Sequence, residues 1–212
     1  MPTEIKICGV TTSEALAAVR KAGAEYVGFV FFPPSPRHLG FVGAARLARM
    51  VEPPLRKVGV FVDPDDATVA EAMAAASLDA IQLHKTSPGR RRELAARFGV
   101  PVWHAAAVAS AADIAGALTH GDDLVLFDAK TPEDAALPGG MGLRFDWTLL
   151  AGIRAPRGFG VAGGLGPGNV AEALRITGAR LVDTSSGVES SPGVKDPDRI
   201  AAFCAEVRAA GA

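Results

Sequence analysis

The sequence predicts an α/β protein in which eight β-α units close into one (β/α)8 barrel, the TIM-barrel class. Short apolar runs rich in Val, Ile and Phe alternate with longer Ala-rich stretches along the whole chain, as in repeated β-α units. Eight units share 212 residues, so each has about 26, and an average strand, helix and two loops need roughly 24. We therefore expect residues 1–212 to form a single catalytic domain and not an open doubly wound sheet.

The predicted strands are short runs in which β-branched and aromatic residues are common. In chain order they are expected at Glu4–Cys8, Tyr26–Phe31, Lys57–Val62, Ala80–Leu83, Val102–Ala106, Leu124–Asp128, Gly158–Ala162 and Arg180–Asp183. The predicted helices follow at Ser13–Lys21, Phe41–Val51, Asp65–Ala76, Gly89–Phe98, Ser110–Leu118, Phe145–Leu150, Gly168–Ile176 and Pro197–Ala209. Suitable N-caps are Thr12, Asp65 and Ser110, and suitable C-terminal stops are Gly23, Gly99 and Gly178.

Alternation within the strands supports closure of the sheet, because successive strand residues point to opposite faces. Apolar residues share one face in the first and third strands, Ile5 and Ile7 in one and Val58, Val60 and Val62 in the other. An open sheet covered on both sides would need apolar residues on both faces. We therefore expect these Ile and Val side chains to face outward beneath the helices, with Lys6 and Cys8 inside the barrel.

Composition excludes several classes of function. The chain has 22 Lys and Arg against 23 Asp and Glu, which gives no general attraction to nucleic acid or to an anionic membrane. No apolar run approaches the roughly 18 residues that a membrane span needs. The first residues lack the basic start and apolar stretch of a secretory signal, so a cytoplasmic location is expected.

The two cysteines, Cys8 and Cys204, stand at opposite ends of the sequence and predict no disulfide framework. Neither has a Cys or His at metal-site spacing, and the four His residues are scattered, so no metal site is predicted. Cys204, in the last Ala-rich helix, is interpreted as a core residue. Cys8 stands at the end of a strand and could be either a buried inert thiol or a reactive one.

Acid and base side chains gather where the predicted strands end, which is where barrels of this class carry their active sites. They are Cys8, Asp63, His84, Asp128 and Asp183, with Arg37 in the loop after the second strand. Asp63 is more simply explained as an N-cap for the next helix, because Pro64 and two acidic residues follow it. This explanation is weaker for Asp128, because a long loop and not a helix follows it.

A second pattern predicts phosphate binding. Glycines at 163, 164, 166 and 168 follow the seventh strand, where they allow close backbone approach to an anion beside a helix start. The eighth strand ends in Asp183-Thr184-Ser185-Ser186-Gly187, whose hydroxyls could complete the same site. Loops after strands seven and eight often hold phosphate in these barrels, although two ordinary glycine turns would have the same appearance.

The ordered combination of several short motifs resembles phosphoribosylanthranilate isomerase. The motifs are Lys6-Ile7-Cys8-Gly9, Gly28-Phe29-Val30-Phe31, Ser35-Pro36-Arg37, Val58-Gly59-Val60-Phe61, Ile81-Gln82-Leu83-His84, Phe145-Asp146-Trp147, Ala162-Gly163-Gly164-Leu165 and Val182-Asp183-Thr184-Ser185-Ser186-Gly187-Val188-Glu189. The resemblance runs from residue 6 to about residue 196. It implies a cofactor-independent Amadori rearrangement of N-(5-phosphoribosyl)anthranilate in tryptophan biosynthesis, by a monomer or homodimer whose partner is this small phosphosugar.

The resemblance also implies residue roles. Asp128 is the expected general acid and Cys8 the expected general base. An apolar strand would raise the pKa of Asp128, and Lys6 on the strand face of Cys8 would favour the thiolate. The substrate-binding residues would be Arg37 for the anthranilate carboxylate, with His84 and Asp183; Gly163, Gly164, Ser186 and Gly187 would hold the phosphate.

The sequence departs from the family pattern at two positions. Met141 stands where a small polar residue is common, so a hydrogen bond near the substrate is in doubt, and Ala129 replaces a frequent Ser. The stretch Ala129–Arg144 is long and contains Pro and Gly, and either a mobile lid or a disordered surface loop would explain it. The basic run Arg90–Arg92 is interpreted as a solvated helix face.

Three alternative functions stay open. A histidine-pathway sugar-phosphate isomerase carries out similar chemistry, but Cys8 replaces the carboxylate that such an enzyme uses at the first strand. A lyase would use Lys6, Lys57 or Lys130 as a Schiff-base nucleophile. The third alternative is a non-catalytic barrel that binds phosphosugars.

Overall fold

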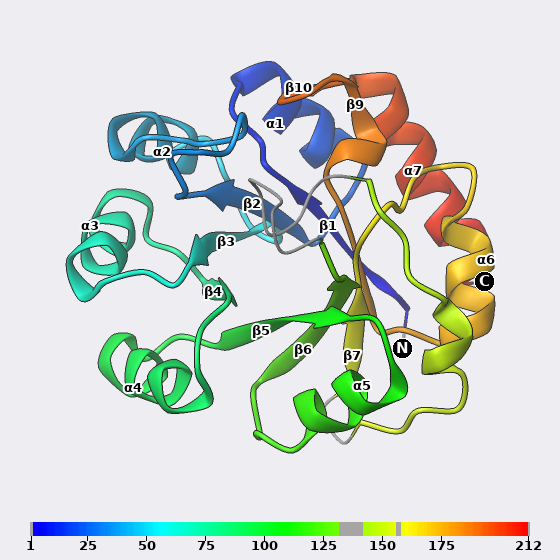
Figure 1. Ribbon diagram of the computed structural model, residues 1–212. Helices are drawn as coiled ribbons and strands as arrows, with labels where there is room; N and C mark the ends of the chain where they lie inside the picture. Colours follow the sequence, from blue (N-terminus) through cyan, green and yellow to red (C-terminus); the bar gives the residue numbers. More distant parts are fainter. Residues whose placement is uncertain (1, 132–141, 156–157, 212) are drawn as a thin grey trace.

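The computed structural model describes residues 2–131, 142–155 and 158–211. Eight parallel strands pair in chain order, and β1 pairs with both β2 and β8, which closes the sheet into a barrel (Figure 1). The strands are β1 (Glu4–Cys8), β2 (Tyr26–Val30), β3 (Arg56–Val62), β4 (Ala80–His84), β5 (Val102–Val108), β6 (Leu124–Ala129), β7 (Phe159–Val161) and β8 (Leu181–Thr184). The predicted fold class is confirmed.

Helices surround the barrel. They are α1 (Ser13–Lys21), α2 (Phe41–Ala48), α3 (Asp66–Ala76), α4 (Pro88–Phe98), α5 (Ala111–Leu118), α6 (Val170–Thr177) and α7 (Pro197–Ala210). The predicted helix at Phe145–Leu150 is only a 3-10 turn, η1 (Trp147–Leu150). A second 3-10 turn, η2 (Ser186–Val188), and a hairpin of β9 (Glu189–Ser191) and β10 (Val194–Lys195) were not predicted.

Local capping chemistry explains why the helices begin where they do. Thr12, Asp65 and Ser110 each accept a backbone N–H of the first turn, as predicted. Asp63, in contrast, is exposed and caps nothing, because Asp65 holds the N-cap position. Gly99 closes α4 in the left-handed conformation, and Gly178 closes α6 in the same way.

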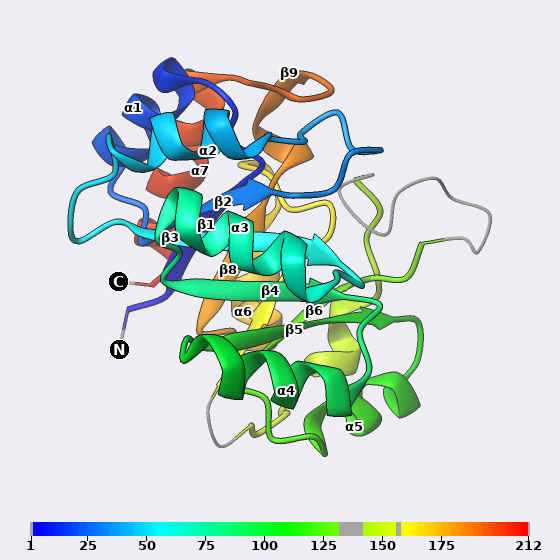
Figure 2. The same ribbon diagram turned by 90° about the vertical axis from the view of Figure 1, so that its left-hand side faces the viewer.

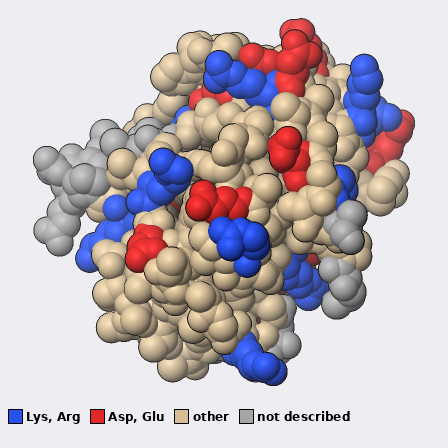
Figure 3. Space-filling model, turned by 90° about the vertical axis from the view of Figure 1, so that its right-hand side faces the viewer, with Lys and Arg blue, Asp and Glu red and all other residues tan. Residues whose placement is uncertain are grey.

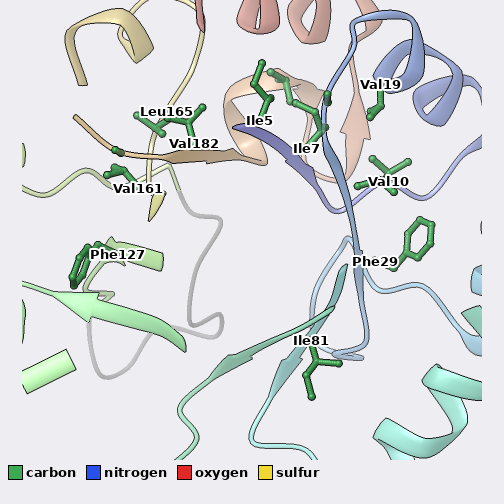
Figure 4. Packing of buried hydrophobic residues seen from close by; sticks show 14 of the residues in the cluster. Ile5, Ile7, Val10, Val19, Phe29, Ile81, Phe127, Val161, Leu165 and Val182 are labelled. Atoms are coloured by element: carbon green, nitrogen blue, oxygen red, sulfur yellow. The ribbon is translucent and has the colours of Figure 1, made fainter. Parts of the chain in front are cut away.

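The outward face of the strands forms the main core with the helices. Ile5 and Ile7 are fully buried there, and Figure 4 shows them, with Phe29 and Phe127, pointing away from the barrel centre. Cys204 on α7 packs in the same layer at 2% exposure, and burial raises the pKa of its thiol to about 11. Its predicted core role is confirmed.

The prediction of which side chains of the third strand face outward is wrong. Val58 and Val60 face into the barrel, where Val58 packs with Tyr26, Trp103 and Leu126 and Val60 packs with Cys8. Phe61 takes the outward position instead and stacks on Phe31 with ring centroids 5.2 Å apart. Both faces of a barrel strand are buried, so apolar character alone does not distinguish inside from outside.

The basic run on α4 is also not a uniformly solvated face. Arg92 is exposed, whereas the Arg91 side chain is 2% exposed and forms a two-pronged ion pair with Asp122, at 2.7 and 2.8 Å. Its third nitrogen donates to the Thr86 carbonyl at 2.6 Å. Arg91 fits under α4 because this partner set satisfies the buried guanidinium.

Figure 2 shows both chain termini at the end of the barrel opposite the carboxyl ends of the strands. No helix in the described part of the chain is long and apolar enough to cross a membrane. On the face shown in Figure 3, basic and acidic side chains are interspersed, in agreement with the balanced composition.

Candidate active site

A pocket opens at the carboxyl end of the barrel, where the loops after the strands meet. It is lined by residues from β1 to β4 and β6 to β8 and their loops: Cys8, Val30, Phe32, Ser35, Arg37, Val60, Val62, Gln82, His84, Asp128, Ala162, Gly163, Gly164, Leu165, Asp183, Thr184, Ser185 and Ser186. Of the nine predicted site residues, all but Gly187 line this pocket.

A buried ion pair lies below the pocket. Lys6 on β1 is fully buried and donates to both carboxylate oxygens of Asp183 on β8, at 3.0 and 2.9 Å. The two residues are register partners on adjacent strands, so the pairing of β1 with β8 brings them together. Burial alone would lower the pKa of Lys6, but Asp183 and Cys8 outweigh it, and the ammonium stays charged. The site therefore has a fixed positive charge beside Cys8.

Cys8 is buried at the end of β1 with its sulfur facing the pocket. Gly28 on β2 makes room for it, because a Cβ there would lie 3.0 Å from the Cys8 sulfur and 3.2 Å from the Lys6 side chain. Burial raises the pKa of the thiol, and the positive charges of Lys6 and Lys195 only partly offset this. Lys6 thus favours the thiolate as expected, but the net pKa is raised and not lowered.

Asp128 ends β6 and faces the pocket. Burial raises its pKa to about 7, the charge of Asp183 adds to the rise, and the Ala129 N–H, which donates to Oδ1 at 2.8 Å, opposes it. Gly163 stands beside this oxygen at a φ of +82°, and a Cβ on it would come within 2.7 Å of Oδ1. Asp128 is therefore a carboxylic acid with a raised pKa, mostly protonated below neutral pH and about half protonated near pH 7.

Arg37 is buried and not an exposed loop residue. Its Nε and Nη2 donate to the two oxygens of Glu189 at 2.7 and 2.8 Å. The stem of Arg37 lies across Gly9, which has a φ of +74°, and a Cβ on that glycine would come within 2.7 Å of it. The guanidinium reaches the pocket at a defined place on its rim.

His84 and Gln82 occupy the end of β4. Burial lowers the pKa of His84 to about 4, with help from the charge of Lys6, so the ring is neutral at neutral pH. Its Nε2 lies 3.1 Å from Nε2 of Gln82, whose Oε1 has no partner among the described residues. This side of the pocket presents neutral polar groups.

The loops after β7 and β8 touch each other through glycine. A Cβ on Gly187 would come within 1.9 Å of the Leu165 carbonyl, so only glycine fits this contact. Gly164 has a φ of +62°, and Asn169 fixes the turn by accepting the Gly166 N–H at 2.9 Å. Gly187 therefore lies behind the pocket wall, while Gly163, Gly164 and Ser186 face the open space.

Sequence reasoning missed a buried charge cluster at the rim. Glu189 and Lys195 belong to the hairpin, and Lys195 donates to Glu189 at 2.6 Å and to the Ser185 carbonyl at 3.0 Å. Burial alone would raise the pKa of Glu189, but Arg37 and Lys195 outweigh it and lower the value. The sequence does contain a signal for this hairpin, because Gly193 is a turn residue between the two short segments that carry Glu189 and Lys195.

Of the two departures from the family pattern, the structure describes only Ala129. Ala129 keeps its main-chain contact with Asp128, so the missing Ser hydroxyl leaves that backbone hydrogen bond in place. Met141 and most of the stretch Ala129–Arg144 lie outside the described residues. Within the described part of the chain, no three His, Cys, Asp or Glu side chains are placed to hold a metal ion.

Comparison with known proteins gives one consistent family. The model of the family "N-(5'phosphoribosyl)anthranilate (PRA) isomerase" matches residues 5–206. A relative of that name from Paracoccus denitrificans is 52% identical over 212 residues, covering 99% of both chains. One from Bradyrhizobium sp. is 51% identical, covering 97% of this chain and 95% of the relative.

Solved structures agree. Phosphoribosyl anthranilate isomerase from Thermotoga maritima superposes with a TM-score of 0.88 at 34% identity, covering 98% of this chain and 99% of the other. A second structure, of an enzyme in complex with reduced 1-(o-carboxyphenylamino)-1-deoxyribulose 5-phosphate, has a TM-score of 0.84 at 31% identity, covering 98% and 99%. The chain therefore belongs to the N-(5′-phosphoribosyl)anthranilate isomerase family.

Proposed function

We propose that this protein catalyses the Amadori rearrangement of N-(5-phosphoribosyl)anthranilate to 1-(2-carboxyphenylamino)-1-deoxyribulose 5-phosphate, a step of tryptophan biosynthesis. The one barrel, residues 1–212, acts as the catalytic domain and uses no cofactor. The observation that carries this proposal is a pocket that combines a thiol, a carboxyl group of raised pKa and an arginine in a chain of this family. The substrate has a carboxylate and a phosphate, and the pocket offers a group for each.

Asp128 is the proposed general acid. The reaction begins when a proton is given to the furanose ring oxygen, the ring C–O bond breaks, and the anthranilate nitrogen forms a protonated Schiff base with C1. An acid for this step must be available in its protonated form near neutral pH, and Asp128 has a substantial protonated fraction there because burial raises its pKa to about 7. A pKa near the working pH is also the best compromise between holding a proton and releasing it.

Cys8 is the proposed general base. It removes the proton from C2 of the Schiff base, and the electron pair of that C–H bond moves toward the imine nitrogen to give an enolamine. Tautomerisation of the enolamine then yields the ketone, so no atoms are gained or lost. Thiolate is the reactive form. Lys6 stabilises it, while burial of Cys8 raises its pKa and makes the thiolate a minor but strongly basic species.

The remaining groups orient the substrate. The planar guanidinium of Arg37 suits the anthranilate carboxylate. His84, neutral at the pH of the cell, and Asp183 are proposed to contact the substrate between its two charged ends. Gly163, Gly164 and Ser186 would receive the phosphate, and Gly187 would support them from behind by holding the two loops together.

The biological setting is proposed from the same reaction. An enzyme of amino-acid biosynthesis is expected in the cytoplasm, with the small phosphosugar and no nucleic acid as its partner. Monomer and homodimer are both compatible with the chain; one related structure from Thermotoga maritima is described as monomers made from a dimeric enzyme. Sedimentation of the purified protein at working concentration distinguishes the two.

The experiment is to add purified protein to phosphoribosylanthranilate and follow the loss of substrate fluorescence. Turnover by the wild type is expected, and both Cys8→Ala and Asp128→Ala should lower kcat by at least about 100-fold, because general acid-base groups contribute roughly 10²- to 10⁴-fold. Binding without turnover would replace the proposal with a phosphosugar-binding barrel. Substrate trapped on the protein by borohydride would indicate a lyase, and undiminished variants would remove the assigned roles while keeping the reaction.

A further inference from the structure

Glu189 contacts Arg37 but does not line the pocket. We propose that Glu189 is a positioning residue that fixes the guanidinium plane of Arg37 for the substrate carboxylate. The inference rests on the proposed function, in which Arg37 binds that carboxylate. It goes beyond that function, because it assigns the specificity of the site to a residue that never touches the substrate.

The carboxylate of Glu189 is held from several sides. Its Oε1 accepts from Arg37 Nε at 2.7 Å and from Lys195 Nζ at 2.6 Å. Its Oε2 accepts from Arg37 Nη2 at 2.8 Å and from the Gly193 N–H at 3.2 Å. The Glu189 side chain is 4% exposed. With four donors around it, this carboxylate has one orientation.

The pairing leaves one edge of Arg37 for a ligand. Glu189 occupies Nε and one hydrogen of Nη2, and Nη1 makes no hydrogen bond to another described residue. The outer edge of a guanidinium, formed by Nη1 and the second hydrogen of Nη2, binds a carboxylate in a two-pronged fashion. Arg37 lines the pocket, so this edge is the one that the substrate carboxylate would meet.

The hairpin holds Glu189 in place independently of Arg37. Arg199 on α7 donates to the main-chain carbonyl of Glu189. Gly193, at a φ of +83°, brings the hairpin turn against the loop of Arg37, since a Cβ there would lie 2.7 Å from the Pro36 carbonyl. The hairpin and the loop that carries Arg37 therefore pack closely against each other at the rim, and the Glu189 carboxylate joins them.

Holding the arginine in advance has a measurable consequence. A free Arg side chain loses rotamer freedom when a ligand fixes it, whereas an arginine that the protein already holds in place has lost that freedom beforehand. This gain in binding affinity applies to a substrate that carries the carboxylate and is absent for a substrate that lacks it. Glu189 should therefore control the preference for the carboxylated substrate, whereas a purely structural residue would affect both substrates alike.

The test compares phosphoribosylanthranilate with its analogue lacking the carboxylate, phosphoribosylaniline. For Glu189→Gln, we expect KM for the carboxylated substrate to rise about tenfold with kcat changed less, since hydrogen bonds to charged groups contribute about that factor or more. KM for the aniline analogue should change little. Glu52→Gln is the matched control, because Glu52 also pairs with an arginine but lies on the exposed surface.

A double-mutant cycle with Arg37→Ala completes the test. In that background, Glu189→Gln should have no further effect on the preference between the two substrates. An equal loss for both substrates, or the same added loss without Arg37, would overturn the inference while leaving the isomerase activity of the wild type in place. If Glu189→Gln does not fold, Glu189→Gln with Lys195→Met keeps the charge of the cluster unchanged and is measured in the same way.

Discussion

Replacement of Asp128 by Asn tests whether this residue is a neutral acid in the folded protein. The carboxyl has a usual pKa of 3.8, and in the fold burial and the charge of Asp183 raise the pKa to about 7. A raised pKa of an acid means that the folded state holds the proton more tightly than the unfolded state. The stability that this proton supports is fully present below pH 3.8 and is lost as the pH rises to about 7.

The magnitude follows from the two pKa values. The difference is about 3 pKa units, and each unit corresponds to 1.36 kcal/mol, so titration of Asp128 costs about 4 kcal/mol of unfolding free energy between pH 4 and pH 7. His84 and His104, whose pKa values are lowered to about 4, act in the opposite direction over much of this range. The wild-type curve alone therefore conceals the effect of Asp128. The difference between the variant and the wild type isolates it.

The assay is urea unfolding of wild type and Asp128→Asn at pH 5, 6, 7 and 8, followed by two spectroscopic probes whose transitions coincide. The stability of the variant relative to the wild type should rise by about 1.4 kcal/mol per pH unit up to pH 7 and then stay level. Asp146→Asn is the control. The pKa of Asp146, an exposed N-cap, is lowered, so its difference curve should be flat above pH 5. Parallel curves for Asp128→Asn and the wild type would refute the neutral-acid assignment.

Two other predictions concern folding and the loops. Arg91→Ala should cost about 3 to 5 kcal/mol in urea unfolding, because it leaves a buried carboxylate without its partner, whereas Arg92→Ala should change stability by less than about 0.5 kcal/mol. Gly187→Ala should raise KM and lower the melting temperature, because the added methyl would meet a backbone carbonyl. Gly168→Ala, which meets open space, is its control, and equal effects of the two would contradict the close-contact argument.

Much of the fold could be predicted because its determinants are local. Strand β1 and helix α1 begin and end where expected, since Thr12 caps the helix and the apolar run defines the strand. The error at Phe145–Leu150 has a local cause as well: Asp146 caps only a single 3-10 turn, and the chain is extended again at Ala151. A cap predicts where a helix begins but not how far it continues.

Pocket residues that stand at strand ends could be predicted from the sequence. Ion pairs between residues far apart in the chain could not. Cys8, Asp128 and Asp183 stand at the ends of the first, sixth and eighth predicted strands, and closure of the sheet brings them together. Glu189 lies 152 positions from the arginine that it holds, and no local pattern signals such a pair. The same reasoning applies to Arg91, which looks like one of three surface arginines until the fold brings Asp122 beneath it.

The charges around the pocket couple the protonation of Asp128, whose pKa burial already raises, to the binding of an anionic substrate. Three buried cations, Lys6, Arg37 and Lys195, face two buried carboxylates, Asp183 and Glu189. While Asp128 holds its proton, this group of side chains has a net charge of one positive. The net charge becomes zero when Asp128 ionises. The proposed substrate brings a carboxylate and a phosphate into this space, so its binding raises the pKa of Asp128 further. Proton and substrate therefore bind cooperatively, because each favours the other by the same free energy. If Asp128 is the general acid, as proposed, the substrate itself would keep it in its protonated, reactive form.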